Sequence, residues 1–313
     1  MTSTLRVEPL NPESTAPLDI FICAAGYETR SRFVAHQLVP KASAYLAIGF
    51  PDQRVLAREE NDHWFLEAGY KLTNTTDKSF NDLISEELNA CLRATTIPVR
   101  RIAVDISCFT RKRLAIIVDV VRRLEFPDPL TVDFYYALAK FSPPPSVSVL
   151  NTHVGPILPT FAGLTTEPDR RTVAVVGLGY EQDKALGAIE HLQTEEEWLF
   201  EPASSIHEYS QALHSANQSL FDRVPPNRVV KYRVEAPLSL FNALESLLYG
   251  LSSEASPVLL PFGPKVFALC SCLVGCLNQN VSVWRVSAEH HEIPLEREPS
   301  GYIGGLSVTF LYP

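Results

Sequence analysis

The sequence lacks the features that would place the chain in a membrane, in a secretory pathway or around a metal. Residues 1–17 have neither the basic start nor the apolar core of a signal peptide. No apolar run is long enough to cross a bilayer as a helix. The six cysteines include no Cys-x-x-Cys pair, which argues against a zinc site. We therefore expect a cytoplasmic protein with no membrane, metal or cofactor requirement.

Basic residues are also scarce. The chain has 27 Lys and Arg against 36 Asp and Glu, a formal net charge of -9. Non-specific binding to duplex nucleic acid depends on neutralising phosphates with Lys and Arg. The charge balance therefore argues against a duplex partner, although an acidic total is compatible with a local basic pocket.

What the sequence does contain is typical of a globular chain of two domains. Its 313 residues suit two units of about 150 residues, and 46% of them are hydrophobic. Short apolar runs alternate with longer segments of helical periodicity, which predicts mainly parallel sheets with helices on both faces.

The predicted elements follow the same order in both halves. In the first half, strands are predicted at residues 18–25, 42–50, 70–73, 99–106 and 130–138, and helices at 28–38, 53–68, 81–94 and 110–124. In the second half, strands are predicted at residues 172–177, 197–200, 229–234, 258–260 and 281–286, and helices at 181–191, 206–221, 238–251 and 264–277.

Short sequence matches indicate a tandem duplication. The tripeptide Gly-Tyr-Glu at residues 26–28 recurs 153 positions later at residues 179–181. The loop at residues 105–107 is matched by residues 261–263, which lie 156 positions later. We therefore predict an α/β fold of two Rossmann-like units, residues 1–164 with a short N-terminal tail and residues 165–313, related by a pseudo-two-fold axis.

The first candidate site is the Gly-Tyr-Glu loop. In open parallel sheets, ligands bind outside the carboxyl ends of the strands. Gly26 allows backbone N–H groups to approach a ligand, and Arg30 stands in the first helical turn, where a bound anion would offset its conflict with the helix dipole. Glu28 either favours the helix start or orients the loop or a ribose hydroxyl, and Gly179 and Glu181 repeat the pattern.

The second candidate site follows the strand predicted at residues 99–106. Asp105, Ser107 and Thr110 precede two of the cations at the next helix start, Arg111 and Lys112. Such a loop can offer hydroxyls, N–H groups and positive charge to a phosphate. The alternative is structural: Thr110 caps the helix and the cations are solvated.

The corresponding loop of the second half is simpler. Gly263 permits close backbone approach, Pro264 suits the first helical position, and Lys265 brings one positive charge to the helix start. A Pro-rich turn before a buried helix is the structural alternative.

Other motifs are weaker. Cys108 and Arg113 miss the Cys-x5-Arg spacing of a phosphatase loop by one position. The Gly-Leu-Gly at residues 177–179 lacks the third glycine of a dinucleotide fingerprint, which argues against NAD. His290-His291-Glu292 has adjacent rather than helically spaced side chains, which favours an exposed turn over metal ligation.

The loop at residues 105–112 resembles the Asp-x-Thr-Gly-Gly-Thr-Lys signature of CARF domains, the Rossmann-like sensors of CRISPR-associated effectors. Asp105, Ser107, Thr110 and Arg111 or Lys112 carry the resemblance, and Gly263 with Lys265 is a reduced version. The pattern departs at residues 108–109, where Cys-Phe replaces Gly-Gly, and in the second copy, which has no Asp.

The resemblance implies binding of a nucleotide-type or other phosphate-bearing small ligand between two such units. The chain would then be a sensor or regulatory component in prokaryotic antiviral defence that acts through a separate effector protein. Two alternatives stay open: a metal-independent, ring-nuclease-like phosphodiesterase that positions phosphate with Ser107, Thr110 and Lys112 or Lys265, and a scaffold with degenerate sites in which Phe109 fills the old pocket.

Overall fold

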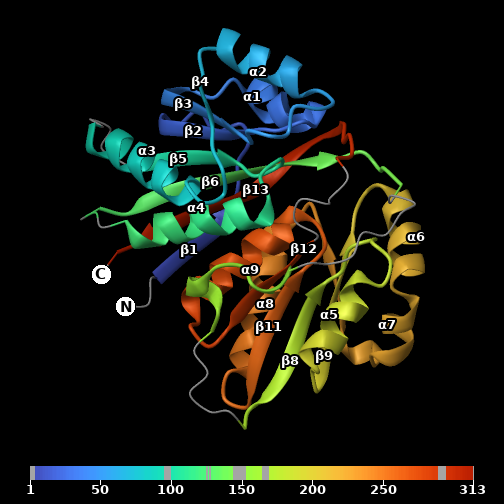
Figure 1. Ribbon diagram of the computed structural model, residues 1–313. Coiled ribbons are helices and arrows are strands. Elements are labelled where there is room, and N and C mark those ends of the chain that lie inside the picture. The colour runs from blue at the N-terminus through green and yellow to red at the C-terminus, as the bar shows by residue number, and fades with distance from the viewer. Residues whose placement is uncertain are drawn as a thin grey trace. The chain divides into compact units, whose positions relative to one another are not determined.

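The computed structural model describes residues 4–94, 100–124, 126, 128–143, 153–163, 169–287 and 294–312. The chain forms two compact units (Figure 1). Unit 1 comprises Met1–Lys140 and Pro294–Pro313, and unit 2 comprises Phe141–Ile293. The boundary expected between residues 164 and 165 lies outside the described residues, as does the His290-His291-Glu292 turn.

Unit 1 contains a mixed sheet in the order β1-β13-β6-β5-β2-β3-β4. Its strands are β1 (Thr4–Pro9), β2 (Leu18–Ala25), β3 (Ala42–Gly49), β4 (Lys71–Asn74), β5 (Arg100–Asp105), β6 (Leu130–Ala139) and β13 (Pro299–Leu311). Five neighbouring strands are parallel, in the order β4, β3, β2, β5 and β6. β13 runs antiparallel to both β6 and β1. All eight residues of β2 are buried, as expected for a central strand covered on both faces.

Helices cover both faces of this sheet (Figure 1). They are the 3₁₀ turn η1 (Thr29–Arg32), α1 (Phe33–Leu38), α2 (Arg58–Glu67), α3 (Phe80–Ala94) and α4 (Arg111–Arg123). Side chains of α1 and α2 share one core cluster with Phe21 and Cys23 of β2. Because strand side chains alternate between faces, Ile20 and Ile22 face the other layer, which α3 and α4 form.

Unit 2 contains a mixed sheet in the order β10-β9-β8-β11-β12-β7. Its strands are β7 (His153–Pro156), β8 (Arg171–Gly177), β9 (Glu196–Ala203), β10 (Val229–Arg233), β11 (Ala255–Pro261) and β12 (Ser282–Ser287). Its helices are η2 (Pro159–Phe161), α5 (Lys184–Leu192), α6 (His207–Ala216), α7 (Gln218–Arg223), η3 (Pro226–Arg228), α8 (Pro237–Leu251) and α9 (Lys265–Leu277). None of the helices in these described ranges combines the length and apolar character that a membrane span needs.

The two sheets share one strand order. Read from one edge, unit 1 has β4-β3-β2-β5-β6-β13, with β1 as an additional strand beyond β13, and unit 2 has β10-β9-β8-β11-β12-β7. In both, five parallel strands are followed by one antiparallel strand. The predicted α/β fold with mainly parallel sheets is therefore confirmed.

The antiparallel strands are exchanged along the chain. β7 follows β6 in the sequence but pairs with β12 of unit 2. β13 follows β12 but pairs with β6 of unit 1. Unit 1 therefore completes its sheet with a strand from beyond its first stretch of chain, whereas unit 2 is one continuous stretch that begins with its antiparallel strand. The sequence did not predict this connection.

Two local predictions need correction. Residues 4–9 were expected to belong to a tail, but they form β1, an edge strand beside β13. The helix expected at residues 206–221 is divided into α6 and α7 at Asn217, whose φ of -123° leaves the helical region.

The exchange predicts how fragments fold. A fragment of residues 1–164 lacks β13, which lies between β6 and β1, so it should show no cooperative unfolding. A control chain should fold cooperatively: residues 1–140 joined by Asn-Gly to residues 298–313. The join is short because the Lys140 N–H donates to the Glu298 carbonyl at 2.8 Å and Ala139 pairs with Pro299. Thermal unfolding followed by circular dichroism compares the two, and a cooperative transition in residues 1–164 would contradict the exchange.

Candidate functional site

The candidate residues lie at the topological switch point of each sheet. In unit 1, the chain leaves β2 toward β3 on one side, while β5 and β6 occupy the other side. The corresponding strands in unit 2 are β8 and β11. All the predicted site residues lie at the ends of these strands, in the loops that leave them or in the first helical turn that follows. Ligands of open α/β sheets bind at this position.

The loop after β2 is held by hydrogen bonds from its own residues. The Gly26 N–H donates to Ser31 Oγ at 2.9 Å, and the Ser31 hydroxyl donates to the Ala24 carbonyl at 2.5 Å. A Cβ on Gly26 would lie 3.2 Å from Cys108 Cβ. Gly26 therefore allows the loops after β2 and β5 to approach each other closely.

An asparagine fixes the Gly-Tyr-Glu loop in both units. Asn61 Nδ2 donates to the carbonyls of Gly26 and Glu28 at 2.9 and 2.8 Å. In unit 2, Asn217 Nδ2 donates to the Gly179 carbonyl at 2.7 Å. Both side chains are buried. Sequence reasoning missed these residues, although their separation of 156 positions repeats the offset of the second loop match.

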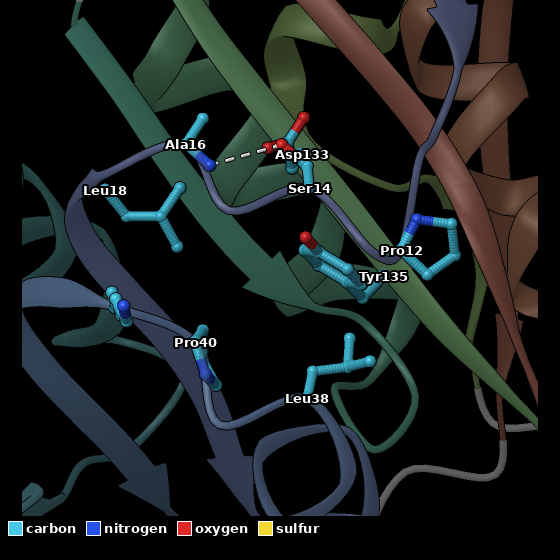
Figure 2. Close-up of a pocket in the computed structure, with 9 residues that line it drawn as sticks. Pro12, Ser14, Ala16, Leu18, Leu38, Pro40, Asp133 and Tyr135 are labelled. Atoms are coloured by element: carbon cyan, nitrogen blue, oxygen red, sulfur yellow. Dashed lines mark hydrogen bonds between the residues drawn. The ribbon is translucent and has the colours of Figure 1, made fainter.

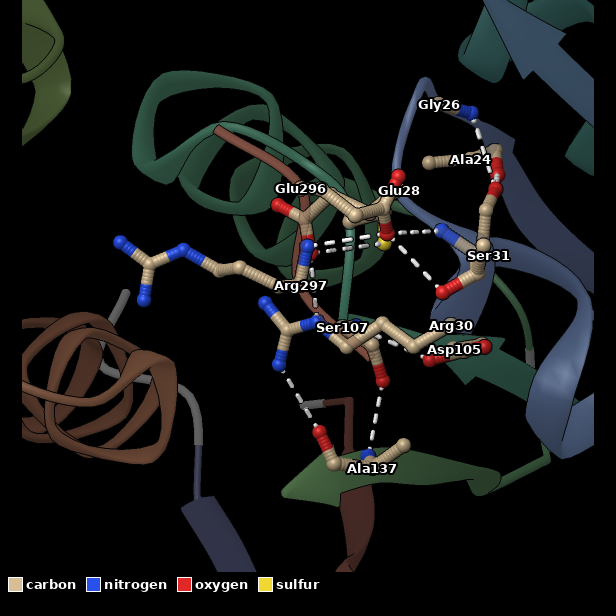
Figure 3. A network of polar contacts seen from close by, with 12 residues as sticks. Ala24, Gly26, Glu28, Arg30, Ser31, Asp105, Ser107, Ala137, Glu296 and Arg297 are labelled. Carbon is tan, nitrogen blue, oxygen red and sulfur yellow. Dashed lines mark hydrogen bonds and ion pairs between the residues drawn. The ribbon is translucent and has the colours of Figure 1, made fainter. Parts of the chain in front are cut away.

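Glu28 and Arg30 form a buried ion pair (Figure 3). Arg30 Nε donates to Glu28 Oε2 at 2.5 Å, and Nη1 donates to the Ala137 carbonyl at 3.0 Å. Burial by itself would lower the pKa of Arg30, but the Glu28 carboxylate, together with Cys108 and Tyr136, outweighs it and raises the pKa above its ordinary value. Arg30 thus stays charged and holds β6 to the loop, a structural role that sequence reasoning had not considered.

A segment far along the chain completes this network (Figure 3). Glu296 Oε1 accepts from the Thr29 N–H at 2.7 Å and from the Thr29 hydroxyl at 2.9 Å. The Cys108 thiol lies 3.7 Å from Glu28 Oε2. The side chain of Arg297 extends away from the other labelled residues. Thr29 and Glu296 are 267 positions apart, so no local sequence signal could have joined them.

The loop after β5 uses its polar side chains internally. Asp105 Oδ1 accepts from the Ser107 N–H at 2.9 Å, and Ser107 Oγ accepts from the Ala137 N–H at 2.8 Å. Thr110 caps α4 by accepting from the Arg113 N–H at 3.2 Å. The capping role that was the structural alternative for Thr110 is therefore present, and these three residues shape the loop.

Phe109 and Arg113 face the core of unit 1. The Phe109 ring is fully buried against Phe80, with centroids 5.9 Å apart. The Arg113 guanidinium lies 3.4 Å from the Phe50 centroid and 4.7 Å from that of Phe80. Burial lowers the pKa of Arg113 to about 10. The Lys112 Nζ forms an ion pair with Asp77 Oδ2 at 3.6 Å.

In unit 2, two glycines bring the loops after β8 and β11 into contact. A Cβ on Gly179 would lie 2.8 Å from the Phe262 carbonyl oxygen, and one on Gly263 would lie 2.4 Å from that of Leu178. The Gly263 N–H donates to the Gly177 carbonyl at 2.9 Å. Glu181, in the same region, pairs with Lys184 at 2.6 Å.

A cation opens the equivalent helix in both units. Arg111 is the first residue of α4, which follows β5, and Lys265 is the first residue of α9, which follows β11. Both side chains are half-buried. A positive charge at a helix start opposes the helix dipole, and an anion bound there relieves the conflict.

A cavity in unit 1 is too small for such a ligand (Figure 2). Its volume is about 30 Å³, whereas small-molecule sites occupy roughly 300–1,000 Å³. Nine residues line it: Pro12, Ser14, Ala16, Leu18, Leu38, Pro40, Lys41, Asp133 and Tyr135. The space suits a single water molecule.

The described residues contain no group of three or more His, Cys, Asp or Glu that could hold a metal ion. Comparisons with family models, curated proteins and solved structures find no match for this chain. The resemblance to CARF domains thus stays a prediction from the loop residues and the order of the elements.

The buried ion pair predicts a large cost of removing one partner. Arg30→Met should lower the free energy of unfolding by about 3–5 kcal/mol, because Glu28 would keep a buried charge without its cation. The double variant Glu28→Gln/Arg30→Met should be less destabilised. Urea denaturation measures the effect, with the exposed Arg6→Met as control. Equal stability of Arg30→Met and the control would contradict this role.

Tyr135 predicts a pH dependence of stability. Burial, helped by the Asp133 carboxylate, raises the pKa of Tyr135 to about 12. The unfolded chain ionises near pH 10, before the folded chain, so stability should fall by roughly 2 kcal/mol between pH 10 and 12. In urea denaturation at pH 9, 10 and 11, Tyr135→Phe should lose less stability than the wild type. The exposed Tyr249→Phe is the control. If the unfolding free energy of Tyr135→Phe falls with pH as steeply as that of the control, the prediction is wrong.

Proposed function

We propose that the protein binds a nucleotide-type or other phosphate-bearing small ligand at the switch points of its sheets. One observation carries the proposal: the equivalent helices α4 and α9 both begin with a half-buried cation, Arg111 and Lys265. In both units a cation opposes the helix dipole at the position where α/β sheets bind ligands. An anion bound at each position would offset this unfavourable interaction.

The surrounding contacts favour binding over chemistry. Asp105, Ser107 and Thr110 accept hydrogen bonds from backbone N–H groups of the loop itself, of β6 and of α4, respectively. Glu28 is engaged by Arg30. These side chains hold the loops in place, so the ligand would meet preorganised N–H groups and the two cations rather than an activated nucleophile.

We further propose that binding serves a sensory or regulatory role. The resemblance of residues 105–112 to CARF domains supports such a role in prokaryotic antiviral defence, with a separate protein as effector. The strand order common to both units supports an origin from one duplicated, pseudo-two-fold related unit.

Calorimetry with a panel of cyclic and linear nucleotides tests the proposal. Arg111→Ala and Lys265→Ala should each weaken binding about 10-fold or more, because a charge-assisted contact to phosphate is lost. Arg6→Ala and Lys231→Ala remove exposed cations of units 1 and 2 and should leave affinity unchanged. The absence of binding by folded wild-type protein, or equal affinities in all four variants, would refute the proposal.

Mass spectrometry of the same mixtures separates a binder from a phosphodiesterase. An unchanged ligand after prolonged incubation is the expected result. A product that forms in the presence of a chelator and disappears in Lys112→Ala or Lys265→Ala would instead establish the enzyme.

A further inference from the structure

Unit 2 carries a cluster of three aromatic side chains, Phe141, Tyr180 and Tyr209. The ring centroids are 5.2 Å apart for Phe141 and Tyr209, 5.5 Å for Tyr180 and Tyr209, and 6.2 Å for Phe141 and Tyr180. The rings are inclined at 87°, 47° and 54°, respectively, so their faces point in different directions. We refer to these residues as the aromatic trio.

The trio lies at the carboxyl edge of the unit 2 sheet. Tyr180 stands three residues beyond the end of β8, and Tyr209 lies in the first turn of α6, which follows the neighbouring strand β9. The Tyr180 position is fixed because the preceding Gly179 carbonyl accepts from buried Asn217. Tyr180 also packs against the core cluster of unit 2.

Partial exposure distinguishes the trio from the aromatic cluster in the core. Phe141, Tyr180 and Tyr209 are all half-buried. By contrast, the neighbouring contact between Phe200 and Phe267 is fully buried. Three clustered rings that stay in contact with water lose part of the free energy that complete burial would provide. Aromatic faces that remain accessible can stack the bases of nucleic acids.

The adjoining loop supplies positive charge. Gly179 lies against the backbone of Phe262, and Lys265 follows Phe262 by three residues. Aromatic faces and a cation on two touching loops match the two halves of a nucleotide, a planar base and a phosphate.

We propose that the aromatic trio stacks the base of a nucleotide whose phosphate lies near Lys265. The inference rests on the proposed function and assigns it a specific surface in unit 2. Stacking on aromatic side chains tolerates any base, so the trio contributes affinity more than selection among bases.

Calorimetry with three classes of probe tests the assignment: the four nucleoside 5′-monophosphates, the corresponding nucleosides, and ribose 5-phosphate. Tyr209→Leu should weaken the binding of the monophosphates and nucleosides about 5- to 100-fold and leave the affinity for ribose 5-phosphate unchanged. Tyr209→Phe retains the ring and should bind like the wild type. Tyr249→Leu removes an exposed tyrosine of the same unit and should have no effect.

The outcomes separate this inference from the phosphate proposal. Tyr209→Leu protein that keeps its melting temperature and its affinity for the monophosphates would overturn the base site, even if Lys265→Ala weakens them. The base site would be supported, and the phosphate contact refuted, if nucleosides bind the wild type, bind Tyr209→Leu more weakly and bind Lys265→Ala with unchanged affinity, and if the monophosphates also bind Lys265→Ala with unchanged affinity. Failure of every probe to bind folded protein would overturn both.

Discussion

Buried guanidinium groups hold the carboxyl edge of the first sheet in one arrangement. Arg30, Arg58 and Arg113 are 4%, 1% and 0% exposed. Each donates to backbone carbonyls: Arg30 to Ala137, Arg58 to Phe50 and Gln53, and Arg113 to Gly49 and Thr75. Because a buried charge is tolerated only when it is fully engaged, these contacts leave the loops little freedom to rearrange.

This constraint divides the cations at the edge into two kinds. Arg30 and Arg113 belong to the framework, since carboxylates and carbonyls surround them. Arg111 and Lys265 begin helices at positions where the backbone itself favours negative charge. The framework cations thus preorganise the loops, and the helix-start cations are the ones suited to an incoming anion.

The sequence predicted most of the local structure but few of the contacts between residues that are far apart in the chain. β2 was predicted at its observed limits because a central strand is one apolar run. β13 was missed as the partner of β6, since periodicity carries no information about which strand an edge will join. The loops of the site were found through glycines and strand ends. The structural role of Arg30 was not predicted, because it depends on a hydrogen bond to the carbonyl of Ala137, which lies 107 positions away.

The exchanged strands also bear on how the protein is made. During synthesis, residues 4–139 emerge from the ribosome first, but the sheet they form lacks β13 until all of unit 2 has been translated. Unit 2 is one continuous stretch of chain that begins with β7, so all of its strands are available before β13 is made. The sheet of unit 1 therefore cannot be completed before unit 2 has been translated, and the β6 edge stays open to other partners until β13 has been made.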